Sequence, residues 1–174
     1  GRLVPYKRVD LVVRALALLR DSHPDLDLVI IGQGPERERL ADLVAELGLT
    51  GRVELRGFVA RHTDVLATIA GAAVFVSASE IEGFGIVVAE AMAMGTPYAV
   101  TDIPAYREVT DGGAGGALFP PGDAQALAAA IASVSEPAAR AACAAAAAGI
   151  AHRYRWDTIA DTTAHELQLV VSSK

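Results

Sequence analysis

Two glutamates enclose a glycine-rich turn in the segment Glu-Gly-Phe-Gly-Ile-Val-Val-Ala-Glu, which runs from Glu82 to Glu90. A short apolar run (73–77) precedes the turn, and an apolar segment of helical character (86–94) follows it. Glycines at a strand-to-helix turn let backbone N–H groups approach a ligand closely. The N-terminus of the following helix adds unpaired N–H groups and the positive end of the helix dipole. This segment therefore predicts an anion-binding site.

Glu90 is a charged residue inside an otherwise apolar predicted helix. Burying a carboxylate without partners is costly, so a ligand that offers hydroxyl groups would satisfy it. The alternative is a Glu90 that faces solvent and binds nothing. The segment by itself leaves these two interpretations equally open.

Two cations, Arg2 and Lys7, flank the short turn 3–6 ahead of the first predicted helix. Positive side chains at the head of a helix add to its dipole and suit a pair of phosphates. Taken alone, the pair is also compatible with two solvated surface cations.

Two further glycine-containing turns follow predicted strands. The segment 32–34 (Gly-Gln-Gly) begins like a dinucleotide-binding fingerprint, but Arg37 stands where the third glycine would be, which argues against an NAD site. Gly57 ends another strand and would present the backbone of Phe58 and Val59 to a flat ligand, unless this is a plain loop.

The remaining reactive residue types do not form a recognisable site. The four histidines lack metal-ligand spacing, and Cys143 is the single cysteine, which excludes a disulfide framework and a cysteine-ligated zinc site. The sequence contains neither a Gly-x-Ser-x-Gly nucleophile turn nor a phosphate loop ending in Gly-Lys-Ser/Thr. We therefore expect no metal ligands in this chain.

Apolar runs that alternate with amphipathic stretches position these residues. Predicted strands cover residues 27–32, 53–56, 73–77, 98–101 and 117–119, and predicted helices cover residues 9–19, 36–47, 64–70, 86–94 and 123–133. Such alternation is typical of an α/β fold with a doubly wound, Rossmann-like parallel sheet. Ligands of these sheets bind at the carboxyl ends of the strands, where the turn at 82–85 falls.

Composition narrows the class of protein. The 174 residues are 52% apolar, which excludes a disordered chain, and the formal net charge of −6 disfavours a nucleic-acid partner. No apolar run approaches the roughly 20 residues needed to cross a bilayer. These features favour a soluble domain in a reducing compartment.

The two ends of the chain differ from a complete doubly wound domain. Residues 1–3 lead directly into a turn and a helix, so the first strand is expected to be missing and the chain to be a fragment of a longer protein. The alanine-rich stretch 123–148 predicts two helices broken near Pro137, and a final helix is predicted from about 157 to 171. We assign residues 1–150 to the Rossmann-like domain and 151–174 to a C-terminal helical segment.

In combination these segments resemble the retaining glycosyltransferases of the GT-B fold, the family called group 1 or family 4. The matching segments are Gly1-Arg-Leu-Val-Pro-Tyr-Lys7, Ile31-Gly-Gln-Gly34, Gly57-Phe-Val59, the stretch from Ser79 to Met92, Gly95-Thr-Pro97, Arg107-Glu-Val109 and Pro120-Pro-Gly-Asp123. The two glutamates beside Gly-Phe-Gly are the signature of that family. The resemblance implies that this chain is the C-terminal, donor-binding half of the fold.

The resemblance also implies a role for each matching residue near the phosphates. Arg2 and Lys7 match the basic pair that holds the donor diphosphate. The loop that covers phosphate and sugar is matched by Gly83, Phe84, Gly85 and Ile86.

The remaining matches concern the sugar and the nucleoside. Glu82 matches the glutamate placed near the transferred sugar, and it is our candidate catalytic residue. Glu90 matches the glutamate that binds the ribose hydroxyls, while Phe58 and Val59 match the backbone that contacts the base.

The resemblance further implies a UDP-, GDP- or ADP-linked sugar as the donor. It also implies a reaction without a cofactor or divalent metal, because basic side chains and a helix dipole offset the charge of the leaving group. The acceptor would be held by an N-terminal domain that this chain lacks, and the helix after Trp156 would cross back onto that domain. The fragment alone would then be inactive. A cytoplasmic location is implied, either free or at the membrane surface through the absent domain.

The sequence departs from the family pattern at Ala78, where proline is frequent, and at Met94, where a smaller residue is usual.

Two alternatives to a transferase remain. One is a sugar-nucleotide epimerase, which shares the GT-B architecture. Such an enzyme is expected to use carboxylate and histidine side chains as acid and base, and the sequence does not identify them. A non-catalytic module that binds sugar nucleotides is the other.

Overall fold

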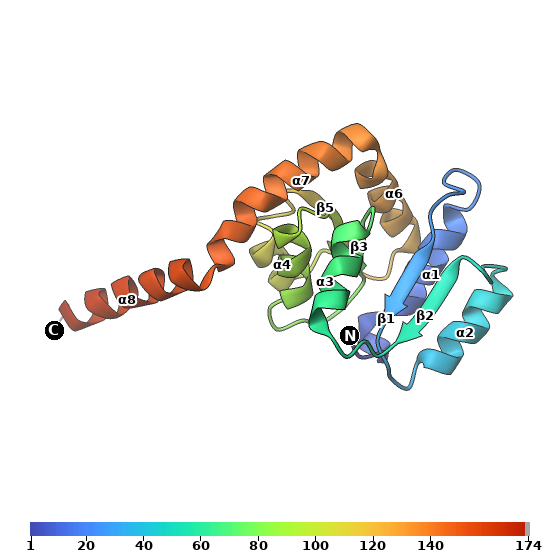
Figure 1. The fold of residues 1–174 in the computed structure, drawn as a ribbon, viewed down its shortest axis with the longest axis horizontal. Coiled ribbons are helices and arrows are strands. Elements are labelled where there is room, and N and C mark those ends of the chain that lie inside the picture. Colours follow the sequence, from blue (N-terminus) through green and yellow to red (C-terminus); the bar gives the residue numbers. More distant parts are fainter. Residues whose placement is uncertain (173–174) are drawn as a thin grey trace.

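The computed structural model describes residues 1–172, in which short strands alternate with helices (Figure 1). The strands are β1 (Leu28–Ile31), β2 (Val53–Gly57), β3 (Phe75–Ser77), β4 (Tyr98–Thr101) and β5 (Gly116–Phe119). The helices are η1 (Pro5–Lys7), α1 (Val9–Leu18), α2 (Arg37–Glu46), α3 (His62–Gly71), α4 (Ile86–Ala93), α5 (Pro104–Val109), α6 (Ala124–Ser135), α7 (Pro137–Ala151), η2 (His152–Tyr154) and α8 (Trp156–Ser172). The predicted α/β class is confirmed.

All strand pairs are parallel. β1 pairs with β2, and a second sheet has the order β3-β4-β5. Next to β1, the N–H groups of Gly1 and Leu3 donate to the carbonyls of Ile31 (2.7 Å) and Gln33 (2.8 Å), and Arg2 forms a parallel bridge with Gln33. Gly1–Leu3 therefore runs parallel to the end of β1, beside it.

Helices cover both faces of the three-stranded sheet, as expected for a doubly wound fold. All four residues of β4 are buried, and their side chains alternate between two apolar clusters. Ala99 joins the cluster shared with α1 and α6, whereas Tyr98 and Val100 join the cluster shared with α4, α5 and α7. This two-sided burial fixes α4 and α5 relative to the carboxyl ends of β3 and β4.

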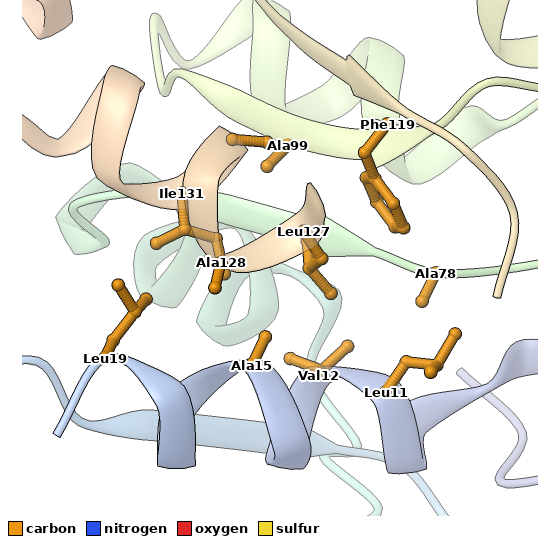
Figure 2. Packing of buried hydrophobic residues seen from close by; sticks show 11 residues of the cluster. Leu11, Val12, Ala15, Leu19, Ala78, Ala99, Phe119, Leu127, Ala128 and Ile131 are labelled. Atoms are coloured by element: carbon orange, nitrogen blue, oxygen red, sulfur yellow. The ribbon is translucent and has the colours of Figure 1, made fainter. Parts of the chain in front are cut away.

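The cluster between α1 and α6 is shown in Figure 2. Val12 and Ala15 of α1 face Leu127 and Ala128 of α6, while Phe119 of β5 closes the cluster on the sheet side. Leu127 and Ala15 are fully buried. The packing couples the helix that follows Lys7 to the sheet that carries the Gly-Phe-Gly turn.

The two-stranded part is covered less completely. Ile30 packs with α1 and α2 on one face. On the other face, Val29, Glu54 and Arg56 are exposed. β2 therefore alternates between half-buried and exposed residues up to the buried Gly57, whereas β4 is buried throughout.

The alanine-rich region forms α6 and α7, as predicted. Asp123 caps α6 by accepting a hydrogen bond from the N–H of Ala126 (2.9 Å), and Pro137 is at the start of α7. α7 lies so close to the loop before β5 that a Cβ on Gly115 would be 2.7 Å from the backbone nitrogen of Ala147. α8 then projects away from the rest of the molecule (Figure 1). Its residues Trp156 and Leu167 are exposed.

Three short elements were not predicted: η1, α5 and the three-residue η2. η1 was assigned to a turn because a three-residue helix opened by Pro5 has no apolar period. α5 was missed because its six residues, Pro104–Val109, are too few to display one. The five predicted strands are present with ends that differ by at most two residues.

We predict that Leu127→Ala lowers the free energy of unfolding by about 2–5 kcal/mol, because it removes a fully buried side chain from the α1–α6 cluster. Denaturant unfolding measures the change. The matched control is Leu167→Ala on α8, where the side chain is 61% exposed and the change should stay within about 0.5 kcal/mol. Equal losses for the two variants would contradict the assigned core.

Candidate donor-binding site

The residues singled out from the sequence lie in loops that follow strands or at the starts of helices. Arg2 precedes η1, and Lys7 ends it. Phe58 and Val59 follow β2, and the turn 82–85 separates β3 from α4. Because parallel strands share one carboxyl edge, these loops belong to the same edge of the fold.

Glu82 and Lys7 form an ion pair across the site. The Lys7 ammonium donates to Oε1 of Glu82, and both side chains are more than two-thirds buried. A second contact joins the same two segments, because the N–H of Glu80 donates to the carbonyl of Tyr6 (2.9 Å). Tyr6, Ile81, Glu82 and Gly83 line a hollow in the surface beside this pair. The structure therefore brings together the predicted diphosphate-binding lysine and the predicted sugar-binding glutamate.

The Glu82 carboxylate is held in its charged form. Burial raises its pKa, but hydrogen bonds from Lys7, Ser79 and Tyr106, together with the positive charge of Lys7, outweigh burial and hold the pKa below its usual range. Glu82 is thus an anion at neutral pH and can only accept hydrogen bonds.

Tyr106 of α5 lies beneath the turn. Its hydroxyl donates to Oε1 of Glu82 at 3.1 Å and lies 2.6 Å from Oγ of Ser77, and the residue is 1% exposed. Gly85, with φ of +91°, approaches the Tyr106 ring so closely that a Cβ would lie 2.8 Å from a ring carbon. Only glycine fits this conformation and this gap.

Arg8 strengthens the link between η1 and the loop after β3. It adopts left-handed backbone angles, with φ of +45°, between η1 and α1. Its guanidinium binds the carboxylates of Asp10 (3.2 Å) and Glu80. A left-handed non-glycine residue costs about 1–2 kcal/mol, and these ion pairs offset part of that cost.

Glu90 is neither free in solvent nor unpartnered. Its side chain is 20% exposed, and Oε1 lies 2.8 Å from Nε2 of His62 at the start of α3. The contact joins α4 to the helix that follows the Phe58–Val59 loop. The interpretation of Glu90 as fully solvent-facing is therefore wrong, while its binding of a hydroxyl-bearing ligand stays a prediction.

The predicted base-contacting loop is close to the segment after β1. The N–H of Gly32 donates to the carbonyl of Gly57 (2.8 Å), and Phe58 is 71% exposed. Gly34 approaches the backbone of Leu3 so tightly that a Cβ would lie 2.2 Å from its carbonyl oxygen. The Gly-Gln-Gly turn thus serves close backbone packing.

The rest of the glycine turn is open to solvent. Gly83, Phe84 and Ile86 are exposed, and Ile86 begins α4. The Phe84 ring contacts the Tyr154 ring edge to face, with centroids 5.2 Å apart and an interplanar angle of 79°. This contact connects the turn to η2.

Four contributors to the site were not found from the sequence: Arg8, His62, Ser77 and Tyr106. Each acts through a contact between segments far apart in the chain, and no local spacing reveals such a contact. Within residues 1–172, no group of three or more His, Cys, Asp or Glu side chains is arranged to hold a metal ion. Across the same residues, no helix is long and apolar enough to cross a membrane.

The parallel sheet, the turn at the head of α4 and the paired carboxylate define a Rossmann-like domain of the GT-B class. The family model of group 1 glycosyl transferases matches residues 1–148. The chain belongs to this family.

Relatives of known activity support the assignment of this chain to the family. The chain is 34% identical over 163 residues to the phosphatidyl-myo-inositol mannosyltransferase of Mycolicibacterium smegmatis, covering 89% of this chain and 40% of that enzyme. The crystal structure of Anabaena HepE in complex with UDP superimposes with a TM-score of 0.82 at 29% identity, covering all of this chain and 47% of HepE. The chain therefore spans less than half the length of these relatives.

A third similarity concerns the fold alone. The C-terminal domain of a group 1 glycosyl transferase (LpcC) from Francisella tularensis superimposes with a TM-score of 0.79 at 24% identity, covering 88% of this chain and 82% of that domain.

We predict that Gly85→Ala lowers the free energy of unfolding by about 1–3 kcal/mol, because the new Cβ meets the Tyr106 ring and the left-handed backbone is strained. Thermal and denaturant unfolding measure this loss. Gly83→Ala is the matched control in the same turn, since a Cβ there has no atom within 4 Å. If the two variants were equally stable, the turn would not be fixed against Tyr106.

Proposed function

We propose that this chain is the donor-binding domain of a retaining, family 4-type glycosyltransferase and that it holds a UDP-, GDP- or ADP-linked sugar. The observation that carries the proposal is the Lys7–Glu82 pair beside a glycine turn at the head of α4, with Glu90 partly buried on the same helix. UDP complexes of structural relatives such as HepE favour a uridine nucleotide.

In this proposal the diphosphate lies over the turn. Arg2 and Lys7 supply positive charge, and the backbone at Gly83, Phe84, Gly85 and Ile86 supplies N–H groups at the positive end of α4. These groups would stabilise the nucleoside diphosphate as it leaves the sugar, without a cofactor or divalent metal.

The nucleoside would extend from the turn toward α3. Glu90 accepts from the vicinal ribose hydroxyls while Oε1 keeps its contact with His62, because a carboxylate has several acceptor positions. The base then lies against the backbone of Phe58 and Val59.

Glu82 has two partners in the proposal. Without donor it neutralises Lys7, and with donor the diphosphate competes for the Lys7 ammonium. The carboxylate is then available to the hydroxyls of the transferred sugar, where it orients the ring during hexosyl transfer with retention of configuration.

The acceptor would be bound by an N-terminal domain of the same protein. The relatives are more than twice as long as this chain, which supports such a domain. The exposed apolar residues of α8, Trp156 and Leu167 among them, would then pack against it. We place residues 1–150 in the donor domain and 151–174 in the crossing segment, residues 173 and 174 being outside the described part of the chain. The proposed location is the cytoplasm, free or at the membrane surface.

Calorimetric titration with UDP, GDP and ADP tests the proposal. We expect one of them to bind, and Lys7→Ala to weaken that binding about 10- to 100-fold, because a hydrogen bond to a charged group is lost. Affinity for the bare nucleoside should not change. Arg14→Ala, at an exposed position of α1, is the control for removing one positive charge. If no diphosphate binds, the proposed function is wrong; equal losses for nucleoside and diphosphate would remove Lys7 from the phosphate site.

Glu90 is tested with a ribose analogue. Glu90→Gln should weaken nucleoside diphosphate binding about 10- to 100-fold, because the bonds to the hydroxyls are charge-assisted. The loss should vanish for the 2′,3′-dideoxy analogue, which has no hydroxyl to bind. A double-mutant cycle of variant and analogue measures the coupling. Zero coupling would show that Glu90 does not contact the ribose.

A further inference from the structure

Tyr106 is a buried side chain whose hydroxyl reaches the site from an element that the sequence patterns did not reveal. We propose that Tyr106 is a positioning residue: its hydroxyl fixes the Glu82 carboxylate, and its ring fixes the backbone of the glycine turn at Gly85. Its relevance to donor sugar binding rests on the proposed function, whereas its effect on Glu82 does not.

The directions of the hydrogen bonds follow from the charge of Glu82. An ionised carboxylate only accepts, so the single hydroxyl proton of Tyr106 points to Oε1. The short contact between Tyr106 and Ser77 must then use the Ser77 proton, which points to the Tyr106 oxygen. Ser79, whose Oγ lies 3.3 Å from Oγ of Ser77, donates its own proton to Glu82. The serine and tyrosine protons are thus all aligned toward Glu82.

Tyr106 acts in this chain as a permanent donor. Burial is the main cause that raises the pKa of Tyr106, to about 12, and the negative charge of Glu82 raises it further. Hydrogen bonds from Ser77 and Ser79 act in the opposite direction but do not cancel this rise. The phenol is therefore protonated at neutral pH and does not serve as a base.

The ring is held by its own helix and by α4. Tyr106 belongs to the apolar cluster that contains Val88 and Met92 of α4 and Val109 of α5. Thr110 donates its side-chain hydroxyl to the Tyr106 carbonyl at 2.5 Å. A side chain packed in this way cannot follow the turn, so the turn must conform to the ring.

Lys7 and Tyr106 contribute differently to the same carboxylate oxygen. Lys7 is a cation that an incoming diphosphate attracts, so its bond to Glu82 is subject to competition. Tyr106 is neutral and buried, so a diphosphate does not draw it away. The tyrosine therefore keeps Glu82 in place while Lys7 changes partners.

The chain offers a matched control in Tyr98 of β4. Tyr98 is also fully buried in the same cluster, and burial likewise raises its pKa. Its hydroxyl, however, donates to the carbonyl of Ala114 and does not contact Glu82. Tyr98→Phe and Tyr106→Phe thus delete the same atom from the same cluster, and only one of them touches the site.

The experiment follows the carboxyl carbon resonance of Glu82 by NMR through the acid range, with Glu82→Gln providing the assignment. Tyr106→Phe should raise the pKa of Glu82 by about one unit, because a hydrogen bond to the charged form is lost. Tyr98→Phe should leave it unchanged. An unchanged value in Tyr106→Phe, or equal shifts in both variants, would overturn the proposal.

Ser77→Ala keeps the proposal testable if Tyr106→Phe does not fold. It removes the donor to the Tyr106 oxygen, and we expect a smaller upward shift of the Glu82 pKa. No shift would count against the alignment of the hydroxyl groups.

Titrations with UDP and UDP-glucose then separate the positioning role of Tyr106 from the proposed donor-binding function. Tyr106→Phe should reduce the affinity for UDP-glucose relative to UDP if Glu82 meets the sugar. Failure of the unsubstituted chain to bind UDP, GDP or ADP, free or linked to a sugar, would overturn the proposed function and leave the NMR result standing.

Discussion

A mostly buried carboxylate must be surrounded by hydrogen-bond donors, and the arrangement of this domain around Glu82 follows from that requirement. Lys7 comes from the turn near the beginning of the chain, 75 residues away, and Tyr106 comes from a helix 24 residues beyond. Neither donor is in place unless α1, α4 and α5 are packed correctly on the sheet. The charge of one side chain thus depends on the packing of both apolar clusters around β4.

The same geometry explains why the site is open and yet ordered. The turn exposes Gly83, Phe84 and Ile86, while Gly85 is pressed against a ring from below. The neighbouring loop is tied to η1 through Glu80, which accepts from Arg8 and donates its N–H to Tyr6. Preorganised N–H groups and cations need little rearrangement when an anion arrives, which is the condition for strong electrostatic stabilisation.

Much of this could be predicted from the sequence because it is encoded locally. The strands are short apolar runs, the turn at 82–85 has its glycines, and the alanine-rich helices have strong intrinsic preference. The environment of Glu90 could not be predicted, because it depends on His62 reaching across from α3. Tyr106 escaped notice because α5 is too short to have a period and because its hydroxyl matters only through a contact between distant segments.

The approach of α7 to the loop before β5 carries an evolutionary consequence. Gly115 faces the backbone of Ala147 with no room for a methyl group, and Ala147 is fully buried. Neither position can accept a larger residue unless the helix moves outward, and such a movement would also shift Ile150 and Tyr154 against α4 and α5. In homologous chains, substitutions at these two positions should therefore occur together or not at all. The two positions are expected to covary during evolution.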